Sequence, residues 1–468
     1  MGTAPAIRRP KPFLFPEYCK GCGRCITACQ HHAIGFTDRI DPRTGLVPVE
    51  IDLDACNGCG LCFDACPEPY GLLKRPDDPA DFELEDPAQL FGGHRHDAPV
   101  PVDRPDRRVA LPACAPLVVK GNYAAAIGAL LAGCRHFFGY PITPSTEGAE
   151  LMAALLPQLQ GVFLQAVSEV AAVNHMYGTG AAGLRSMTFT SSPGFSLMLE
   201  GISYMIGAEV PGVFVNIMRG GPGLGNIGPE QADIKLACRG LGHGNTHAIV
   251  LAPSTPQEML DMTLQAFDLS FAYRNPVVVL GDGYLGQMTG RVLLPSSCVV
   301  PGLPAWAVWG DEQHRGNLIC SIHLNEADLE RHNIRLNAKY ERMRAEARAE
   351  CFMCGDAEVI VVACNTPARM AKGAVEELRG AGVKAGLFRP QTLWPFPIDP
   401  LLALLPRARR ILVVEASAGQ LEDELRLALS HAEARGVPRI ESIRHYGGIL
   451  PQQHEIVATV AAGELVRA

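Results

Sequence analysis

The chain has little charge and no long apolar run. Only 19% of its 468 residues are Asp, Glu, Lys or Arg, whereas 47% are hydrophobic, which argues against long disordered regions and predicts large buried cores. Acidic residues (49) outnumber basic ones (41), which excludes a general attraction to nucleic acids or anionic membranes. No apolar run reaches the roughly 18 residues that span a bilayer, and the N-terminus lacks the apolar segment of a secretion signal. We therefore expect a cytoplasmic protein with no nucleic-acid or membrane partner.

Shifts in composition divide the chain into five segments: three domains, a linker and a linking helix. A usual domain length of roughly 150 residues likewise suggests three domains. Residues 1–73 are rich in cysteine, and residues 74–116 are rich in Pro and Asp, as in an extended linker. In residues 117–323, Ala- and Leu-rich stretches alternate with short β-rich runs, which predicts βα units around a largely parallel sheet. A charged linking helix is expected over residues 324–352, and a second α/β unit over residues 353–468.

Eight of the sixteen cysteines lie between positions 19 and 66. In a reducing compartment such thiolates bind metal rather than form disulfides. The spacing Cys-x2-Cys-x2-Cys-x3-Cys occurs twice, and in this pattern three cysteines hold one [4Fe–4S] cluster while the fourth reaches the other. One cluster is therefore predicted on Cys19, Cys22, Cys25 and Cys66, and the other on Cys56, Cys59, Cys62 and Cys29.

The alternative for these cysteines is a pair of zinc sites, but zinc usually binds two separated pairs of ligands. Over residues 13–70 the sequence resembles the bacterial two-cluster ferredoxins. It differs at Gln30, where that family usually has proline after the fourth cysteine. Because Cys29 is retained, the difference concerns the turn rather than cluster ligation. The resemblance implies a ferredoxin-like domain that transfers single electrons at low potential.

Residues 139–147 (Gly-Tyr-Pro-Ile-Thr-Pro-Ser-Thr-Glu) have the pattern of a β-strand that ends in a proline-fixed loop and continues into a helix. Ser145 or Thr146 can cap this helix, and Glu147 in its first turn complements the helix dipole. Loops at the carboxyl ends of parallel strands are where α/β proteins bind ligands. On this pattern alone, an ordinary strand–loop–helix connection remains an alternative.

Three further motifs belong with this loop: Ser-Ser-Pro-Gly at 191–194, Met-Arg-Gly-Gly-Pro-Gly at 218–223, and Arg-Pro-Gln-Thr-Leu-Trp-Pro-Phe-Pro at 389–397. With them, residues 120–427 resemble the alpha subunits of 2-oxoacid:ferredoxin oxidoreductases that act on branched-chain 2-oxoacids and 2-oxoglutarate. The resemblance implies an α/β fold with a thiamine pyrimidine-binding domain and a transketolase C-terminal-like domain. It also implies oxidative decarboxylation of a 2-oxoacid with coenzyme A to acyl-CoA and CO2, with the electrons leaving through two [4Fe–4S] clusters.

The same resemblance assigns three catalytic residues. Glu169 would bond N1′ of the thiamine aminopyrimidine and promote loss of the C2 proton, although a glutamate at a helix start can simply complement the dipole. Arg219 would bind the substrate carboxylate through its guanidinium fork, unless it is an ordinary surface arginine. Thr143 would donate its hydroxyl to the substrate, unless it caps the loop. The residues expected to contact the cofactor besides Glu169 are Pro141, Ile142 and Ser192.

A second subunit is expected to hold most of the thiamine diphosphate and its Mg²⁺. Gly281-Asp282-Gly283 resembles the start of a motif for these groups, but the asparagines expected further along the chain are missing. The resemblance therefore implies a beta subunit and a composite site in a heteromer. A gamma subunit and an electron acceptor, either ferredoxin or a flavin/NAD subunit, complete the expected partners.

The identity of the acyl group and two other functions stay open. Tyr140, Met218, Leu224 and Ile227 are predicted to form an apolar pocket for a branched or aromatic 2-oxoacid, while a beta subunit could supply a cation for 2-oxoglutarate. One alternative function is pure electron transfer, with the α/β part as a docking scaffold. The other is non-oxidative thiamine-dependent decarboxylation, which would release an aldehyde.

Overall fold

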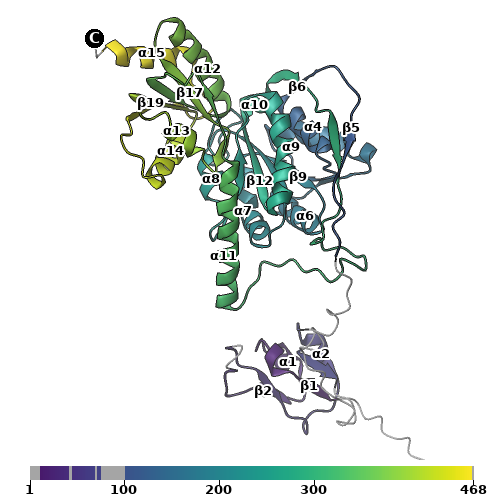
Figure 1. Cartoon of the computed structure of the whole chain (residues 1–468). Coiled ribbons are helices and arrows are strands. Elements are labelled where there is room, and N and C mark those ends of the chain that lie inside the picture. The colour runs from purple at the N-terminus through teal and green to yellow at the C-terminus, as the bar shows by residue number, and fades with distance from the viewer. Residues whose placement is uncertain (1–10, 42–44, 69–70, 75–100, 466–468) are drawn as a thin grey trace, which may run out of the picture. The chain divides into compact units, whose positions relative to one another are not determined.

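The chain forms two compact units in the computed structural model, which describes residues 11–41, 45–68, 71–74 and 101–465. The units comprise residues 1–98 and 99–468 (Figure 1), and their boundary falls inside the predicted linker. A small cysteine-rich unit followed by a large α/β unit confirms the predicted fold class. Across the described ranges, no helix is both long enough and apolar enough to cross a bilayer.

In the first unit, each cysteine-rich loop leads into a short helix. The two helices, α1 (Arg24–Ala28) and α2 (Leu61–Ala65), pack against each other. Each begins after a glycine with positive φ, Gly23 at 72° and Gly60 at 88°, a conformation that side chains with a Cβ rarely adopt. Two antiparallel ribbons complete the unit: β1 (Pro12–Leu14) with β4 (Leu72–Lys74), and β2 (Ile34–Phe36) with β3 (Val49–Ile51).

The second unit is built on a seven-stranded sheet whose strands are parallel except at one edge. Two of its central strands are mostly apolar and have every residue buried, as expected when helices cover both faces. The predicted parallel sheet is thereby confirmed. In spatial order the strands are β18 (Thr392–Trp394), β11 (Ile249–Leu251), β12 (Pro276–Asp282), β10 (Gly212–Met218), β9 (Ser186–Thr190), β7 (His136–Gly139) and β8 (Val162–Gln165).

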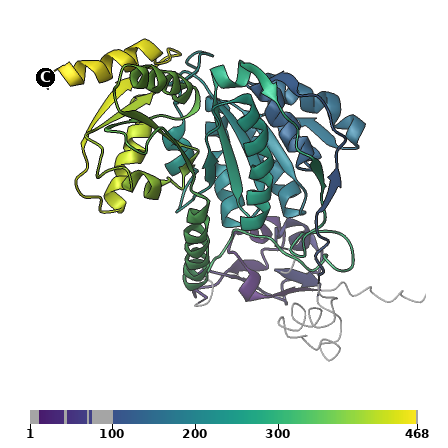
Figure 2. The same cartoon turned by 45° about the horizontal axis from the view of Figure 1, so that its top comes forward.

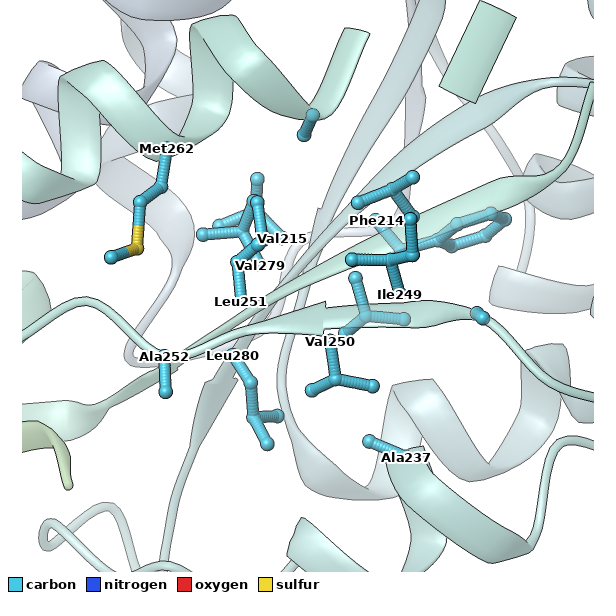
Figure 3. Close-up of a cluster of buried hydrophobic side chains, with 14 of the residues drawn as sticks. Phe214, Val215, Ala237, Ile249, Val250, Leu251, Ala252, Met262, Val279 and Leu280 are labelled. Atoms are coloured by element: carbon cyan, nitrogen blue, oxygen red, sulfur yellow. The ribbon is translucent and has the colours of Figure 1, made fainter. Parts of the chain in front are cut away.

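Helices form layers against this sheet, and Figures 1 and 2 show α9 running along the strands. Successive residues of β11 face opposite layers (Figure 3): Leu251 lies toward Met262 of α9, whereas Val250 lies toward Ala237 of α8. This alternation packs one strand against both helical layers. The helices are α4 (Gly121–Leu131), α5 (Thr146–Leu155) and α9 (Pro256–Tyr273), and α6 (Glu169–Ala181), α7 (Ser192–Gly207) and α8 (Ile234–Arg239).

A five-stranded sheet follows the predicted linking helix. That helix, α11 (Glu326–Met343), is shorter than predicted, because Ala349–Phe352 forms β15, an antiparallel edge strand. The predicted linker also contains an ordered strand, β5 (Arg107–Ala110), which pairs with β14 (Ser297–Val300). Besides β15, the elements are β17 (Ala385–Pro390), β16 (Val359–Val362), β19 (Arg410–Glu415) and β20 (Arg439–Arg444), with α12 (Asn365–Gly380), α14 (Gln420–His431) and α15 (Gln453–Leu465).

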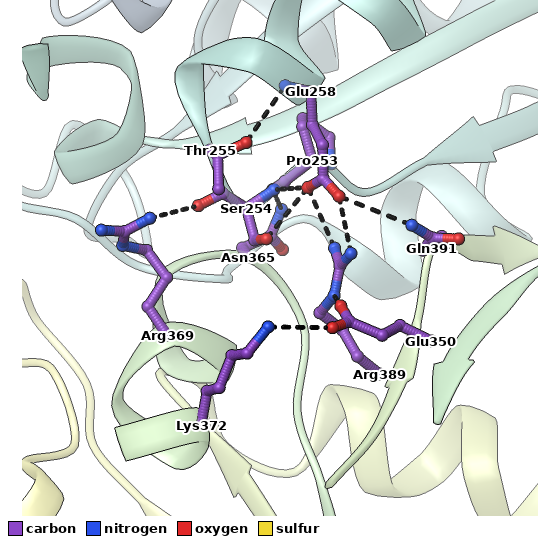
Figure 4. A network of polar contacts seen from close by, with 10 residues as sticks. All are labelled: Pro253, Ser254, Thr255, Glu258, Glu350, Asn365, Arg369, Lys372, Arg389 and Gln391. Carbon is purple, nitrogen blue, oxygen red and sulfur yellow. Dashed lines mark hydrogen bonds and ion pairs between the residues drawn. The ribbon is translucent and has the colours of Figure 1, made fainter. Parts of the chain in front are cut away.

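A buried ion-pair network joins the two sheets (Figure 4). Arg389 of β17 donates two hydrogen bonds to the Glu258 carboxylate, at 3.0 and 2.6 Å, and one to Glu350 at 2.7 Å. Such a bidentate fork is directional as well as strong. Because Glu258 lies in α9 and Glu350 in β15, the network fixes the five-stranded sheet against the central one. Strand β18 adds to this connection by extending the central sheet from the C-terminal half of the chain.

Candidate active site

Four of the predicted site residues follow four adjacent parallel strands. Arg219 follows β10, Ser192 follows β9, Thr143 follows β7 and Glu169 follows β8, and these strands are neighbours in that order. The carboxyl ends of parallel strands lie at one edge of a sheet, where α/β proteins bind ligands. The structure therefore brings these side chains to one edge, although they are scattered over 77 positions from 143 to 219.

The guanidinium of Arg219 is held by two backbone carbonyls. Nη1 donates to the Thr143 carbonyl at 2.8 Å, and Nη2 donates to the Leu224 carbonyl at 3.2 Å. The residue is 9% exposed, and its buried Nε–H has no hydrogen-bond partner in the described part of the chain. Arg219 is thus an oriented, buried cation with hydrogen-bonding capacity left over, unlike the surface arginine of the alternative interpretation.

The Ser192 hydroxyl binds the backbone of Arg219. It donates to the Asp233 carboxylate at 2.6 Å and accepts the Arg219 backbone N–H at 3.1 Å. Asn216 also donates to Asp233, at 2.9 Å. Burial raises the pKa of Asp233, while hydrogen bonds from Ser192 and Asn216 act in the opposite direction. The Ser192 hydroxyl is therefore engaged within the chain, and its predicted cofactor contact stays a prediction.

Glu169 is a buried carboxylate without a partner. It opens α6, whose cap is the Ser168 side chain, and it is only 6% exposed. No hydrogen bond or ion pair of its carboxylate is found among the described residues, and the buried hydroxyls of Thr190 and Ser191 also lack partners. Because buried polar groups are nearly always paired, such a cluster indicates a site for a polar ligand.

Glycine at position 194 provides space beside this carboxylate. A Cβ at residue 194 would lie 2.5 Å from both Glu169 Oε1 and Thr190 Oγ1, which is too close for non-bonded atoms. The Ser-Ser-Pro-Gly motif thus keeps α7 close to α6 without covering the Glu169 carboxylate.

The loop that carries Thr143 is fixed at the neighbouring Pro144 carbonyl. Asn122 and Gln287 donate to this oxygen at 2.7 and 3.2 Å, and Asn122 also donates to Glu147 at 3.0 Å. Burial alone would raise the Glu147 pKa, but hydrogen bonds including those from Gln287, Asn122 and Lys120 leave that pKa below its ordinary value. The Thr143 hydroxyl itself makes no hydrogen bond within the described chain, and the side chains of Pro141 and Thr143 are exposed. Hydrogen bonds therefore hold the loop at the Pro144 carbonyl, whereas the side chains of Pro141 and Thr143 are open to solvent.

Asp282 has no capacity for a metal ion, as its sequence context suggested. Its buried carboxylate caps α10 (Gly283–Gln287) by accepting the Tyr284 and Leu285 N–H groups. It also accepts the backbone N–H and the hydroxyl of Thr366, at 2.9 and 2.7 Å. Asp282 thus connects the central sheet to α12 rather than binding Mg²⁺.

The predicted apolar pocket is partly wrong. Met218 is completely buried within β10 and cannot line an open site. Tyr140, Leu224 and Ile227 are exposed, Leu224 to 81%, and the Leu224 carbonyl binds the same guanidinium as the Thr143 carbonyl. The apolar side chains around Arg219 are therefore those of the loops, not of the strand.

In the first unit, one cavity is lined by Cys19, Cys22, Cys25 and Cys66, the four cysteines whose spacing assigns them to one cluster. Among the described residues, no three His, Cys, Asp or Glu side chains converge on a point that could hold a single metal ion. Four thiolates on one zinc would lie about 3.8 Å apart, given a Zn–S bond of about 2.3 Å. Thiolates on a cubane each bind a different iron and surround a volume, and a cavity lined by all four cysteines is compatible with that arrangement.

Backbone N–H groups point at the cysteine sulfurs in both sets. Val49 N donates to Cys19 Sγ at 3.4 Å, and Ala33 N donates to Cys29 Sγ at 3.3 Å. Gly58 N lies 3.4 Å from Cys56 Sγ. Such donors stabilise negative charge on the sulfurs and tune the potential of a cluster.

Sequence reasoning missed several of these residues. The buried carboxylate of Asp233, the amide of Asn122 and the hydroxyls of Thr190 and Ser191 all belong to the site. The available signals were the Ser-Ser-Pro-Gly motif, which contains Ser191, and the position of Thr190 at the end of a strand. Asp233 and Asn122 reach the site only through the packing of distant segments.

Three family models match the chain. They are the pyruvate flavodoxin/ferredoxin oxidoreductase thiamine diphosphate-binding domain over residues 127–303, the pyruvate:ferredoxin oxidoreductase core domain II over residues 357–456, and the 4Fe–4S dicluster domain over residues 18–69. The first two cover the central sheet and the C-terminal sheet, and the third covers both cysteine motifs.

Curated relatives and a solved structure agree with these models. The chain is 44% identical over 346 residues to the ketoisovalerate oxidoreductase subunit VorB of Methanothermobacter thermautotrophicus, covering 73% of this chain and 96% of that protein. It is 36% identical over 357 residues to the 2-oxoglutarate synthase subunit KorA of Archaeoglobus fulgidus, covering 74% and 99%. Both relatives are named as subunits.

The solved structure is a 2-oxoglutarate:ferredoxin oxidoreductase from Magnetococcus marinus with 2-oxoglutarate, coenzyme A and succinyl-CoA bound, at 28% identity and a TM-score of 0.64. The match covers 74% of this chain and 65% of that one. With the VorB and KorA relatives matched over nearly their whole length, the chain belongs to the 2-oxoacid:ferredoxin oxidoreductase family and carries a 4Fe–4S dicluster domain at its N-terminus.

Proposed function

We propose that this chain is the alpha subunit of an enzyme that oxidatively decarboxylates a 2-oxoacid with coenzyme A, and that its two [4Fe–4S] clusters carry the electrons away. The observation that carries the proposal is the pairing, at one edge of the central sheet, of an oriented cation, Arg219, with an unpartnered buried carboxylate, Glu169. A 2-oxoacid brings an anion, and an aminopyrimidine brings hydrogen-bond donors. Neither alternative function, the electron-transfer scaffold or the non-oxidative decarboxylase, requires this cation and this carboxylate together with two clusters.

Arg219 is proposed to bind the substrate carboxylate. Its Thr143 and Leu224 contacts orient the guanidinium without neutralising it, because both acceptors are uncharged carbonyls. The unpaired Nε–H gives an incoming carboxylate a further donor. The free hydroxyl of Thr143 lies on the same loop and is proposed to donate to the substrate.

Glu169 is proposed to hold the aminopyrimidine of thiamine diphosphate. When bound, this cofactor supplies a carbanion that attacks the 2-oxo carbon and retains the electrons left behind by CO2. The Glu169 carboxylate would accept a hydrogen bond at N1′ and so favour removal of the C2 proton. Pro141, Ile142, Thr190 and Ser191 are the proposed further neighbours of the cofactor.

A beta subunit is proposed to complete the site. Exposed apolar side chains occur close to Glu169 in the sequence and on the helix α7 that packs against α6: Val167, which precedes α6, is 89% exposed, Val170 of α6 is 43% exposed and Leu197 of α7 is 53% exposed. Exposed apolar side chains gathered beside a site typically mark a surface that a partner covers. Asp282 cannot ligate Mg²⁺, so the beta subunit would supply the diphosphate and Mg²⁺ ligands. A gamma subunit and ferredoxin or a flavin/NAD subunit are the further proposed partners.

A branched-chain 2-oxoacid is the proposed substrate class. The exposed apolar side chains of Tyr140, Leu224 and Ile227 belong to the two loops whose Thr143 and Leu224 carbonyls bind Arg219. In residues 139–147 and 219–230, Arg219 is the only Arg or Lys, so these loops offer no second cation for the distal carboxylate of 2-oxoglutarate. The ketoisovalerate relative at 44% identity supports the same choice.

The test is a substrate panel with the anaerobically purified complex and a viologen dye. Branched-chain 2-oxoacids should reduce the dye only when coenzyme A is present, with acyl-CoA and CO2 formed in equal amounts. Aldehyde without dye reduction would favour non-oxidative decarboxylation. Dye reduction by a reduced partner protein, without turnover of any 2-oxoacid, would favour the electron-transfer scaffold.

A further inference from the structure

The loop after β10 is a closed structure that determines where the Arg219 guanidinium lies. This arginine loop (residues 219–229) is closed by hydrogen bonds from Gly220 N to Gly228 O and from Asn226 N to Gly220 O, both 3.0 Å. It also provides the Leu224 carbonyl that accepts from Arg219 Nη2. A change in the shape of the loop would therefore move the guanidinium.

A turn of the C-terminal half of the chain contacts this loop directly. The C-terminal turn (residues 446–448) follows β20. Gly447 accepts a hydrogen bond from Asn226 Nδ2 at 2.9 Å. A Cβ at residue 228 would lie only 2.8 Å from the Gly448 Cα atom, so the two backbones touch at glycines. The arginine loop and the C-terminal turn are therefore in close contact although more than 200 residues separate them.

Glu230 connects the two segments through one oxygen. Its Oε2 accepts the Gly221 N–H of the arginine loop at 3.2 Å and the Gly447 N–H of the C-terminal turn at 3.0 Å. A second connection follows at the next residue: Gln231 N donates to Ala416 O at 2.7 Å, and Ala416 N donates to Gln231 Oε1 at 2.8 Å. The end of the loop is thus bound to the C-terminal sheet on both sides of Glu230.

Burying the Glu230 carboxylate between these segments costs free energy, because no cation among the described residues compensates its charge. Glu230 is 7% exposed, and no Arg, Lys or His pairs with it in the described part of the chain. Burial raises its pKa, and the Gly447 and Gly221 N–H donors only partly oppose this effect. A buried carboxylate without a cation does not contribute to stability in the way that an apolar side chain would. Its geometry, two N–H groups on one oxygen, instead fixes a relative position.

We propose that Glu230 is a positioning residue through which the C-terminal turn holds the arginine loop, and with it Arg219, in the orientation that binds the substrate carboxylate. The inference rests on the proposed function of Arg219. It gives the C-terminal half of the chain a part in 2-oxoacid recognition, although its turn contacts the loop and not the guanidinium.

Three variants of the assembled complex test this inference. Glu230→Ala removes the shared acceptor, and Gly228→Ala inserts a methyl group between the loop and the turn. Both should raise KM for the 2-oxoacid about ten- to a hundredfold, with KM for coenzyme A and the cluster spectra unchanged. Glu230→Gln keeps an oxygen that can accept both N–H groups and should restore most of the loss. The matched control is Gly380→Ala, where the added methyl meets nothing within 4 Å.

Hydrogen exchange separates a failure of this inference from a failure of the proposed function. The amides of residues 220–228 should exchange faster in the Glu230→Ala chain than in the wild type, whether or not any 2-oxoacid is turned over. Unchanged exchange would overturn the inference. Provided that the wild-type complex oxidises 2-oxoacids, an unchanged KM for the 2-oxoacid in both alanine variants would also overturn the inference. A rise in KM for coenzyme A as large as the rise in KM for the 2-oxoacid would do the same. If Glu230→Ala does not fold, the Gly228→Ala result decides.

Discussion

Arg219 donates a hydrogen bond from Nη1 to the carbonyl oxygen of Thr143 at a distance of 2.8 Å. This bond joins the loop after β10 to the loop after β7, across the end of β9. The cation is thus oriented by backbone acceptors, which cannot change rotamer as a side-chain partner could. Both loops must keep their shape for the arginine to keep its direction.

Arg219→Lys keeps the charge and removes the planar fork. Lysine cannot reach the Thr143 and Leu224 carbonyls and still present donors to a carboxylate. Loss of one charge-assisted hydrogen bond is worth about 1.5–3 kcal/mol, so kcat/KM for the 2-oxoacid should fall by roughly ten- to a hundredfold, mainly through KM. Steady-state kinetics with a viologen dye would measure this. Arg331→Lys, at an exposed position on α11, is the control, and an equal loss there would count against a specific role.

Glu169→Gln removes the carboxylate charge with little change in shape. If Glu169 promotes proton loss from the cofactor, kcat should fall by about 10²- to 10⁴-fold, while the iron content and the EPR spectrum of the reduced clusters stay as in the wild type. Glu200→Gln changes an exposed glutamate on the neighbouring helix α7 and should leave kcat unchanged. Full activity of the Glu169 variant would contradict the proposed role of this carboxylate in proton loss from the cofactor.

Asn122→Ala removes one of the two donors to the Pro144 carbonyl. Asn122 is completely buried, and its loss also removes one of the donors to the Glu147 carboxylate. We expect a loss of about 1–3 kcal/mol in the free energy of unfolding and a higher KM for the 2-oxoacid, because the Thr143 loop is no longer held. Thermal unfolding and kinetics on the same preparation would check both. Asn174→Ala, at an exposed position on α6, should change neither quantity.

Single cysteine variants should divide the eight ligands into two sets. Each set takes three cysteines from one motif and the fourth from the other. Cys66→Ser should alter the same cluster signal as Cys19→Ser, although position 66 belongs to the second motif, because these sulfurs line one cavity. Cys29→Ser should match Cys56→Ser instead. EPR of the anaerobically reduced protein and an iron determination, about eight per chain before substitution, would show the pairing. Cys66→Ser resembling Cys56→Ser would contradict it, and Cys114→Ser, an exposed cysteine outside the motifs, is the control.

The Glu258–Arg389 pair should make the second unit sensitive to acid. Burial alone would raise the Glu258 pKa, but the Arg389 hydrogen bonds and charge leave that pKa below its ordinary value of 4.5. A lowered folded-state pKa contributes stability that is complete above the unfolded value and is lost as pH falls through the folded value. Glu258→Gln should therefore be less stable than wild type at pH ~7 and closer to it below pH ~4. Thermal unfolding at both pH values would show a gap that narrows on acidification, and a gap of constant size would contradict this account.

The sequence alone predicted features that depend on local spacing. Two cysteine motifs gave the cluster ligand sets, and the alternation of helical and β-rich stretches gave the parallel sheet. The strand-end positions of Thr143 and Arg219 followed from apolar runs that stop at Gly139 and Met218. The predictions of the parallel sheet and of the strand ends succeeded because a strand end is specified by residues within a few positions of one another. The cluster ligand sets stay a prediction.

Other expectations failed where pairing between distant segments decided the outcome. Residues 349–352 resemble the charged helix before them, yet they form β15 because β17 offers a free edge. Met218 was expected to line a pocket, but every residue of β10 is buried between strands and helical layers. The contacts of the Ser192 hydroxyl with Asp233 and the Arg219 backbone were not foreseen either, and its cofactor contact stays a prediction.

By itself, therefore, the sequence determined the order of α/β segments and the identity of the residues at the strand ends, and it predicted the cluster ligands. Only the tertiary structure decided which of those residues meet, that Glu169 is buried without a partner, and that Glu230 joins the arginine loop to a turn more than 200 residues away. The physical reason is that spacing along a chain fixes contacts within one turn or loop. Contacts between loops depend on strand order and on the burial of polar groups, which no local pattern encodes.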